Sequence, residues 1–179
     1  MYRKEFYVFD QDQPIPAVIR NYKEVDFHSL IEIQRESFPP PFPDELLWNK
    51  AQLQNHIELF PEGALCIEID GVIAGSMTGL LVDYGHGDLD HTWQEITDNG
   101  YIRNHNPSGN TLYVVDISVR PYARKLGLGK CLMLSMYEVV VQLTQLSSVF
   151  DKNTSKIDFS RIKTLIYQRL PSGNLNVVT

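Results

Sequence analysis

The sequence has few cysteines and no long apolar run. Only two of its 179 residues are cysteine. Cys66 and Cys131 lack metal-site spacing and a neighbouring histidine, so we expect both to be reduced core residues. No apolar stretch reaches the roughly 20 residues that a membrane-spanning helix needs, and the first residues, Met1–Tyr7, lack the apolar core of a signal peptide. These absences predict a cytoplasmic protein with no membrane partner.

Positive charge is also in short supply. The chain has sixteen Lys and Arg and 22 Asp and Glu, which gives a net charge of -6 and argues against nonspecific binding to nucleic acid. The length fits one domain with a sizeable core, which we place over residues 1–179. Hydrophobic residues at 43% and charged residues at 21% are ordinary for a globular chain.

A strand, a turn and a helix follow one another near residue 120. In residues 112–119, side chains alternate so that Val114 and Asp116 share one face while Val115 and Ile117 lie on the other, which predicts a strand. Beyond the turn, apolar residues recur at spacings of three and four, which predicts a helix. These residues are Leu128, Leu132, Met136, Val139, Val140 and Leu143.

The turn itself has the features of an anion site. Pro121 ends the strand because it has no N–H to donate, and Gly127 and Gly129 let the backbone turn and approach a ligand closely. The first N–H groups of the following helix, and its dipole, favour an anion such as pyrophosphate. Four basic residues gather here in an otherwise acidic chain: Arg120, Arg124, Lys125 and Lys130. The alternative is that both glycines serve packing alone.

The string Arg-Pro-x-x-Arg-x-x-Gly-x-Gly between a strand and a helix resembles the acetyl-CoA-binding motif of the GNAT superfamily of acyl-CoA-dependent N-acyltransferases. It matches neither a P-loop, which needs Gly-Lys-Ser/Thr, nor a Rossmann fingerprint. Lys125 stands where family members often have glycine. The resemblance spans roughly residues 19–143. It implies an α/β (α+β) domain with a mixed, mostly antiparallel sheet flanked by helices.

The resemblance also implies roles for individual residues. Acetyl-CoA would be the co-substrate, with no metal, and backbone groups near Ile117 and Val119 would pair with its pantetheine arm. The turn residues that would hold its phosphates are Arg124, Lys125, Gly127, Gly129 and Lys130. Asp116 is the candidate general base, or else a polar residue on the wet face of a strand. Tyr167 is the candidate acid, or else a packing residue, and Tyr113 and Tyr122 rank below it.

The predicted order of elements before the turn is the one found in GNAT proteins. Residues 1–16 are expected to form an arm or short edge strand, and residues 17–20 a short strand. Helices should run from Val25 to Phe38 and from an N-cap at Asp44 to the residue before Pro61. Strands at 64–69 and 72–82 should pair through an Asp70-Gly71 hairpin turn.

The polar segment 83–110 is longer than a hairpin loop should be. A metal site could be imagined from its histidines and aspartates, but they lack a recognised spacing. They are His86, Asp88, Asp90, His91 and His105. Trp93, Ile96 and Tyr101 could instead anchor a short helical turn in a solvated loop. We favour a third reading, a lid over the acceptor substrate that does not hold the fold together.

Two further features concern the rest of the chain. The pattern Trp93-x-x-Ile96-Thr97, continuing to Leu112-Tyr113, resembles the GNAT module that accompanies a carbon-nitrogen hydrolase domain in some bacterial proteins. Residues 144–179 depart from the family: they are divergent or shortened, weakly helical over 159–170, with an ending too short to complete the sheet.

The sequence therefore predicts transfer of an acetyl group from acetyl-CoA to a primary amine of a small molecule or protein. The acidic insertion mildly favours a cationic acceptor. The alternative from another class is a non-catalytic CoA-binding module, regulatory or remnant, and a nucleotide-phosphate binder ranks third. A homodimer is left open.

Overall fold

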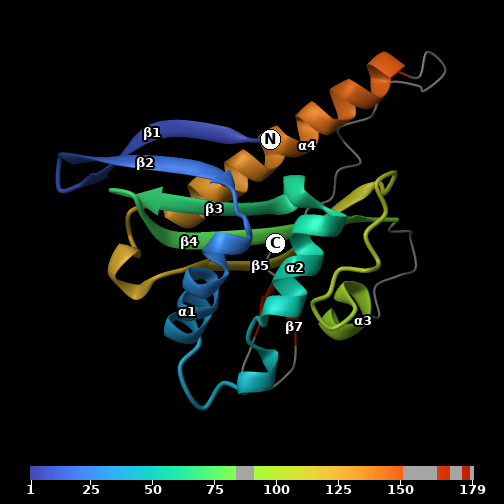
Figure 1. The fold of residues 1–179 in the computed structure, drawn as a ribbon, viewed down its shortest axis with the longest axis horizontal. Coiled ribbons are helices and arrows are strands. Elements are labelled where there is room, and N and C mark those ends of the chain that lie inside the picture. The colour runs from blue at the N-terminus through green and yellow to red at the C-terminus, as the bar shows by residue number, and fades with distance from the viewer. Residues whose placement is uncertain (84–90, 151–164, 170–174, 178–179) are drawn as a thin grey trace.

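The computed structural model describes residues 1–83, 91–150, 165–169 and 175–177. Its centre is one seven-stranded sheet in which strands adjacent in sequence are adjacent in space, from β1 to β7 (Figure 1). Strands β1 to β5 are antiparallel, β6 is parallel to β5, and β7 is antiparallel to β6. The strands are β1 (Arg3–Asp10), β2 (Gln13–Asn21), β3 (Ala64–Ile69), β4 (Val72–Val82), β5 (Thr111–Val119), β6 (Leu165–Arg169) and β7 (Leu175–Val177). The predicted mixed, mostly antiparallel fold class is confirmed.

Helices cover both faces of this sheet. The α-helices are α1 (Phe27–Ser37), α2 (Lys50–Leu59), α3 (Trp93–Thr97) and α4 (Leu128–Phe150). Short 3-10 helices are η1 (Glu24–Asp26), η2 (Asp44–Leu46), η3 (Pro61–Gly63) and η4 (Pro121–Ala123). Figure 1 shows α1 and α2 in front of the sheet and α4 behind it. The front is therefore called the α1 face below, and the back the α4 face.

The amino-terminal residues form more strand than predicted. β1 and β2 make a hairpin whose turn residues, Gln11 and Asp12, both have positive φ (46° and 73°), as a tight two-residue hairpin turn requires. β1 is the edge strand. Its alternation is hard to see in the sequence because Tyr7 and Phe9, on its outer side, are apolar and exposed while Val8 is buried.

The first helix and the central hairpin follow the predictions, and the second helix begins later than predicted. α1 ends before the prolines at 39–41, and Asp70 and Gly71 have the positive φ (49° and 77°) of the expected turn. Asp44 starts only the short helix η2. The N-cap of α2 is Asn49, whose side chain accepts from the Gln52 N–H at 3.0 Å while the Gln52 side chain accepts from the Asn49 N–H.

A β-bulge at Val115 interrupts the alternation predicted for β5. Thr78 pairs with Asp116 and the next residue, Gly79, pairs with Val114, so Val115 has no partner of its own. A Cβ on Gly79 would meet Met136 of α4, whereas Asp116 bonds to α1, so Val114 and Asp116 face opposite sides. The prediction that residues 114 and 116 share a face is therefore wrong.

The segment 83–110 is packed into the fold as far as it is described. Trp93 on α3 and Ile102 belong to the hydrophobic core, and Ile102 is fully buried. The His105 ring stacks on Phe60 at 4.2 Å and accepts from the Leu81 N–H. The short helix was predicted, but the expectation that this segment does not hold the fold together is wrong, since its apolar residues complete the core.

The carboxyl end also differs from the prediction. Residues 165–169, expected to be weakly helical, form strand β6, and residues 175–177 add β7. The helix after the turn continues to Phe150. Residues 165–169 read LIYQR, with two adjacent β-prone residues, Ile166 and Tyr167, and their pairing with β5 outweighs the weak helical pattern of the surrounding residues.

Candidate active site

The turn between β5 and α4 has a conformation that requires glycine at one position. Gly127 has φ of +75°, and Lys125 shares this left-handed conformation. A Cβ on Gly127 would meet nothing within 4 Å, and one on Gly129 would only touch Ile117 at 3.7 Å. Close packing therefore does not explain either glycine. Gly127 serves the path of the backbone and leaves open space beside it.

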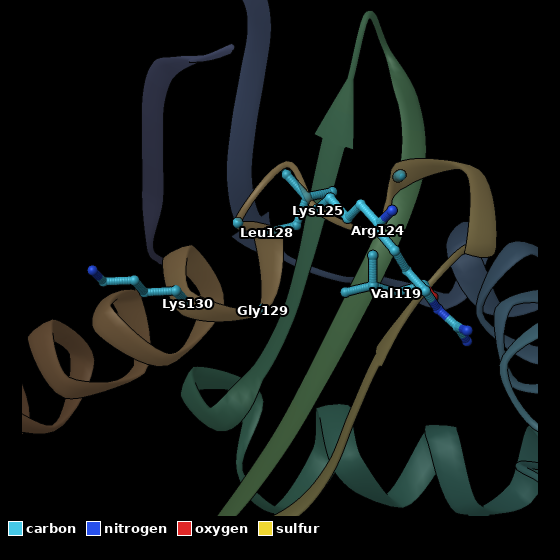
Figure 2. A pocket seen from close by; sticks show the side chains of 8 residues that line it. Val119, Arg124, Lys125, Leu128, Gly129 and Lys130 are labelled. Carbon is cyan, nitrogen blue, oxygen red and sulfur yellow. The ribbon is translucent and has the colours of Figure 1, made fainter. Parts of the chain in front are cut away.

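That open space is a pocket of about 340 Å³ on the protein surface (Figure 2). It is lined by Val119, Ala123, Arg124, Lys125, Gly127, Leu128, Gly129 and Lys130. Six of these residues were predicted for the cofactor site, and Ala123 and Leu128 are additions. Ile117 is not among the lining residues, although it lies beneath Gly129.

The start of α4 gives the pocket donors for an anion. The first hydrogen bond of the helix joins the Cys131 N–H to the Gly127 carbonyl at 3.0 Å. The N–H groups of Leu128, Gly129 and Lys130 precede it, so helix geometry provides them with no intrahelical acceptor. The helix dipole adds partial positive charge at the same end.

Three of the four clustered basic residues line the pocket. Arg124, Lys125 and Lys130 are exposed around the turn, with Arg124 and Lys130 on opposite sides in Figure 2. Arg120 is instead held by Glu36 and Glu32 of α1 and donates to the Ile73 carbonyl at 3.0 Å. The expectation that all four gather around the anion is wrong for Arg120, which ties the end of β5 to α1 and β4.

One edge of β5 is open next to this pocket. Within the described residues, β6 pairs with β5 only at Tyr113 and Val114, so the strands do not pair beyond the bulge. The Arg120 N–H donates to β4, at Ala74, and because backbone groups alternate sides along a strand, those of Val119 and Ile117 point to the open edge. The Val119 carbonyl accordingly accepts from Ser37 and Arg124.

Asp116 lies on the α1 face in a polar cluster. Its Oδ2 accepts from Gln34 Nε2 at 2.7 Å and from Ser118 Oγ at 2.8 Å, and Gln34 also donates to Ser118. Gln34 is fully buried, and its Oε1 has no partner among the described residues. Asp116 itself is half-buried, so a wet strand face does not describe its surroundings.

Sequence reasoning missed Gln34 and Ser118. The available signal was the position of Gln34 within the apolar stripe of α1, four residues after Leu30 and next to Ile33, where a polar residue is rarely buried without a partner.

A second buried polar chain runs from the insertion toward the same strands. His56 Nε2 lies 2.7 Å from the Gly100 carbonyl, Tyr22 Oη lies 2.9 Å from His56 Nδ1, and Thr78 Oγ1 lies 3.0 Å from Tyr22 Oη. A carbonyl only accepts, so Nε2 carries the proton, Tyr22 donates to Nδ1, and Thr78 donates to Tyr22. Burial lowers the pKa of His56 to about 4, which keeps this ring neutral.

The tyrosines considered as acids fall in different places. Tyr167 lies in strand β6 and not in a helix. Tyr113 is fully buried on β5, and Tyr122 is 66% exposed on η4, outside the lining of the pocket. The role of Tyr167 as the acid stays a prediction.

The hypothesis of a metal site in segment 83–110 involves five residues, of which the structure describes only His91 and His105. Across 1–83, 91–150, 165–169 and 175–177, no group of three or more His, Cys, Asp or Glu could hold a metal ion. Three of the residues considered, His86, Asp88 and Asp90, lie outside the described residues. Within the described part, no helix combines the length and the apolar character that a membrane crossing requires.

The chain belongs to the acetyltransferase (GNAT) family, because the model described as "Acetyltransferase (GNAT) family" matches residues 27–161, three quarters of its length. A curated relative, "Uncharacterized N-acetyltransferase YkwB" of Bacillus subtilis (strain 168), is 58% identical over 138 residues, which are 77% of this chain and 61% of YkwB. "Probable hydrolase YhcX" of the same organism is 43% identical over 112 residues, 63% of this chain and 21% of YhcX. The chain thus spans about three fifths and one fifth of these relatives. The predicted GNAT resemblance is confirmed.

Solved structures show the same fold. The loading GNATL domain of CurA from Lyngbya majuscula has a TM-score of 0.56 at 19% identity, over 68% of this chain and 57% of that one. The "GphF GNAT-like decarboxylase in complex with isobutyryl-CoA" has the same TM-score and coverage at 21% identity. At such identity the likeness concerns the fold alone.

Proposed function

We propose that this chain transfers an acetyl group from acetyl-CoA to a primary amine of a small molecule or protein. The observation that carries the proposal is the combination of an anion pocket at the Arg124–Lys130 turn with a carboxylate, Asp116, three residues before the end of the adjoining strand. The name of the relative YkwB, an N-acetyltransferase, supports this class of reaction, and a protein of the same fold, GphF, is described in complex with isobutyryl-CoA.

The pyrophosphate of CoA would lie on the turn. A diphosphate needs several donors at close range, and the pocket offers the first N–H groups of α4 with Arg124, Lys125 and Lys130 around them. Gly127 has no Cβ to occupy the space beside the backbone, and the protein as a whole is acidic, with net charge -6. A local cluster of cations on an acidic protein favours a small anionic ligand over a polyanion.

The pantetheine arm would follow the open edge of β5. Its two amides need backbone partners in an extended register, and Val119 and Ile117 point their backbone groups to that edge. This path leads from the phosphate turn toward Val115 and Asp116, so the thioester would lie next to the bulge. Backbone pairing of this kind would hold the reacting carbonyl in line with an incoming amine.

Asp116 would take the proton from the amine. A lysine-like amine has a pKa near 10.4, so only about one molecule in a thousand is neutral at pH 7. Loss of the proton to Asp116 frees the nitrogen lone pair, and the nitrogen bonds to the thioester carbon. The C–S bond then breaks to release the CoA thiolate, and the nitrogen gives its second proton to solvent, which leaves a neutral amide. Gln34 and Ser118 hold the carboxylate in one orientation. We keep Tyr167 as the proposed proton donor to the thiolate.

The proposal is tested by following thiolate release from acetyl-CoA in the presence of an amine panel of polyamines, aminoglycosides and lysine peptides. We expect turnover with at least one amine, and a fall of about a hundredfold in kcat for Asp116→Asn with CoA affinity unchanged, because the change removes proton acceptance and little shape. Asp70→Asn is the matched control, because Asp70 lies in the β3–β4 turn, away from Thr78, the ladder partner of Asp116, and outside the polar cluster around that carboxylate.

The competing function is CoA binding without catalysis. It predicts CoA binding by calorimetry and no thiolate release with any amine. Equal kcat for Asp116→Asn and Asp70→Asn would remove Asp116 from the mechanism while leaving the transferase assignment intact.

A further inference from the structure

The bulge on β5 is held from outside the sheet by the insertion. Val115 has no ladder partner, and its carbonyl accepts from the indole Nε1 of Trp93 at 3.0 Å, in a buried setting. A buried carbonyl without a donor would be costly, so this bond stabilises the bulged conformation over a regular ladder. Trp93 is the first residue of α3, which lies within the inserted segment.

The bulge determines where Asp116 points. Without it, β5 would keep the plain alternation, and the residue at 116 would face α4 and the core behind the sheet. With it, Asp116 faces α1, where Gln34 and Ser118 bond to its carboxylate. The conformation of one residue, Val115, therefore decides whether the proposed base reaches the side of the sheet on which its polar partners lie.

Trp93 is itself fixed by its neighbours. Thr97 Oγ1 donates to the Trp93 carbonyl at 2.7 Å and accepts from the Gly100 N–H at 2.9 Å. The loop after α3 is anchored by the Gly100 carbonyl to His56, and by the Asn99 carbonyl to Gln52. A rigid donor is what a positioning contact needs, because a mobile one would not select one backbone conformation.

We propose that Trp93 is a positioning residue for acetyl transfer: its indole N–H holds the Val115 bulge and thereby orients Asp116. This inference rests on the proposed function for its catalytic consequence. It gives the insertion a defined task at the reacting end of the site, in place of the lid predicted from its polarity.

The test is Trp93→Phe, which keeps an aromatic ring and removes the donor. Trp48→Phe is the matched control, since no hydrogen bond joins the Trp48 indole to a described residue and both rings are buried in the same cluster. We expect kcat to fall about tenfold or more for Trp93→Phe, with the Kd for CoA within twofold, and to stay within twofold of wild type for Trp48→Phe.

Hydrogen exchange of peptides covering residues 111–119 supplies a readout that does not need activity. Loss of one buried hydrogen bond should speed exchange at the bulge about five- to tenfold in Trp93→Phe and leave it unchanged in Trp48→Phe. If Trp93→Phe does not fold, 3-benzothienylalanine at position 93, which replaces N–H by sulfur in the same shape, takes its place.

The outcomes separate the two proposals. An active wild type with equal kcat in both variants overturns the positioning role and leaves the proposed function standing. A wild type that transfers nothing to any amine overturns the proposed function, and the exchange rates alone then decide whether Trp93 holds the bulge. Equal exchange in the two variants overturns that as well.

Discussion

Gly100→Ala tests most sharply whether the inserted segment is part of the core. Gly100 has φ of +81°, and a Cβ there would lie 2.6 Å from the Trp48 ring, 3.0 Å from the Trp93 ring and 3.1 Å from Gln52 Nε2. Two penalties follow: about 1–2 kcal/mol for a side chain in the left-handed region, and about 1–3 kcal/mol for overpacking. We expect a total loss of about 2–5 kcal/mol.

Gly71→Ala isolates the packing term. Gly71 has nearly the same φ, +77°, but a Cβ there would meet nothing within 4 Å, so only the first penalty applies. Equilibrium unfolding in urea, followed by far-ultraviolet circular dichroism, should show Gly100→Ala less stable than Gly71→Ala by about 1–3 kcal/mol. Equal losses of stability in the two variants would mean that the segment does not pack against Trp48, and would favour the hypothesis that it is a lid over the acceptor substrate.

Two further predictions concern pH and charge. Burial keeps His56 neutral in the folded protein, with its pKa lowered to about 4, while the unfolded chain takes up a proton near pH 6.5; stability should therefore fall by roughly 3 kcal/mol as pH drops from 6.5 to 4. Urea unfolding with an unchanged midpoint between pH 7.5 and 5 would contradict this. Lys125→Gln should weaken CoA binding by about three- to tenfold through the loss of one cation at the phosphates. Arg120→Gln should leave the affinity for CoA unchanged, because Arg120 is paired with Glu36 and Glu32. Equal losses of CoA affinity in the two variants would show that Lys125 and Arg120 do not differ in their contact with the phosphates.

The parts of the fold that could be predicted were those with strong local signals. Asp-Gly between two apolar runs predicts a hairpin because only a turn with two positive φ angles fits, and the structure has it. The turn at 121–130 was also readable, because its glycines, its basic residues and the helix after it all point to one kind of ligand. Six of the residues predicted for that site line the pocket.

The β-bulge in β5 could not be predicted from the sequence, and as a result Val114 and Asp116 were assigned to the same face of the sheet. A prediction from strict alternation over residues 112–119 assumes that every residue of β5 is paired with one residue of β4, whereas Val115 has no such ladder partner. What stabilises the bulge is a donor 22 residues earlier in the chain, the Trp93 indole. No local pattern reports a contact of that range. The prediction that Asp116 lies on the face opposite Ile117 therefore holds, whereas the prediction that it shares a face with Val114 does not.

The insertion was misread because its composition and its packing disagree. Glycine, asparagine and aspartate dominate it and indicate a solvated loop, while the few residues that matter to the core, Trp93 and Ile102, are separated by polar ones. The polar atoms between them also have defined partners, such as the Gly100 carbonyl on His56. Polarity in a sequence therefore does not distinguish a solvated segment from one whose backbone is bonded to buried side chains.

Calorimetric titration of CoA into two glycine variants shows whether the turn after β5 binds the pyrophosphate of CoA. Gly127→Glu places bulk and negative charge in the pocket, and Gly71→Glu makes the same change at a glycine with the same backbone conformation and equally open surroundings. We predict that Gly127→Glu raises the Kd for CoA at least about tenfold, while Gly71→Glu leaves it at the wild-type value. An equal Kd in the two variants would contradict the assignment of the site.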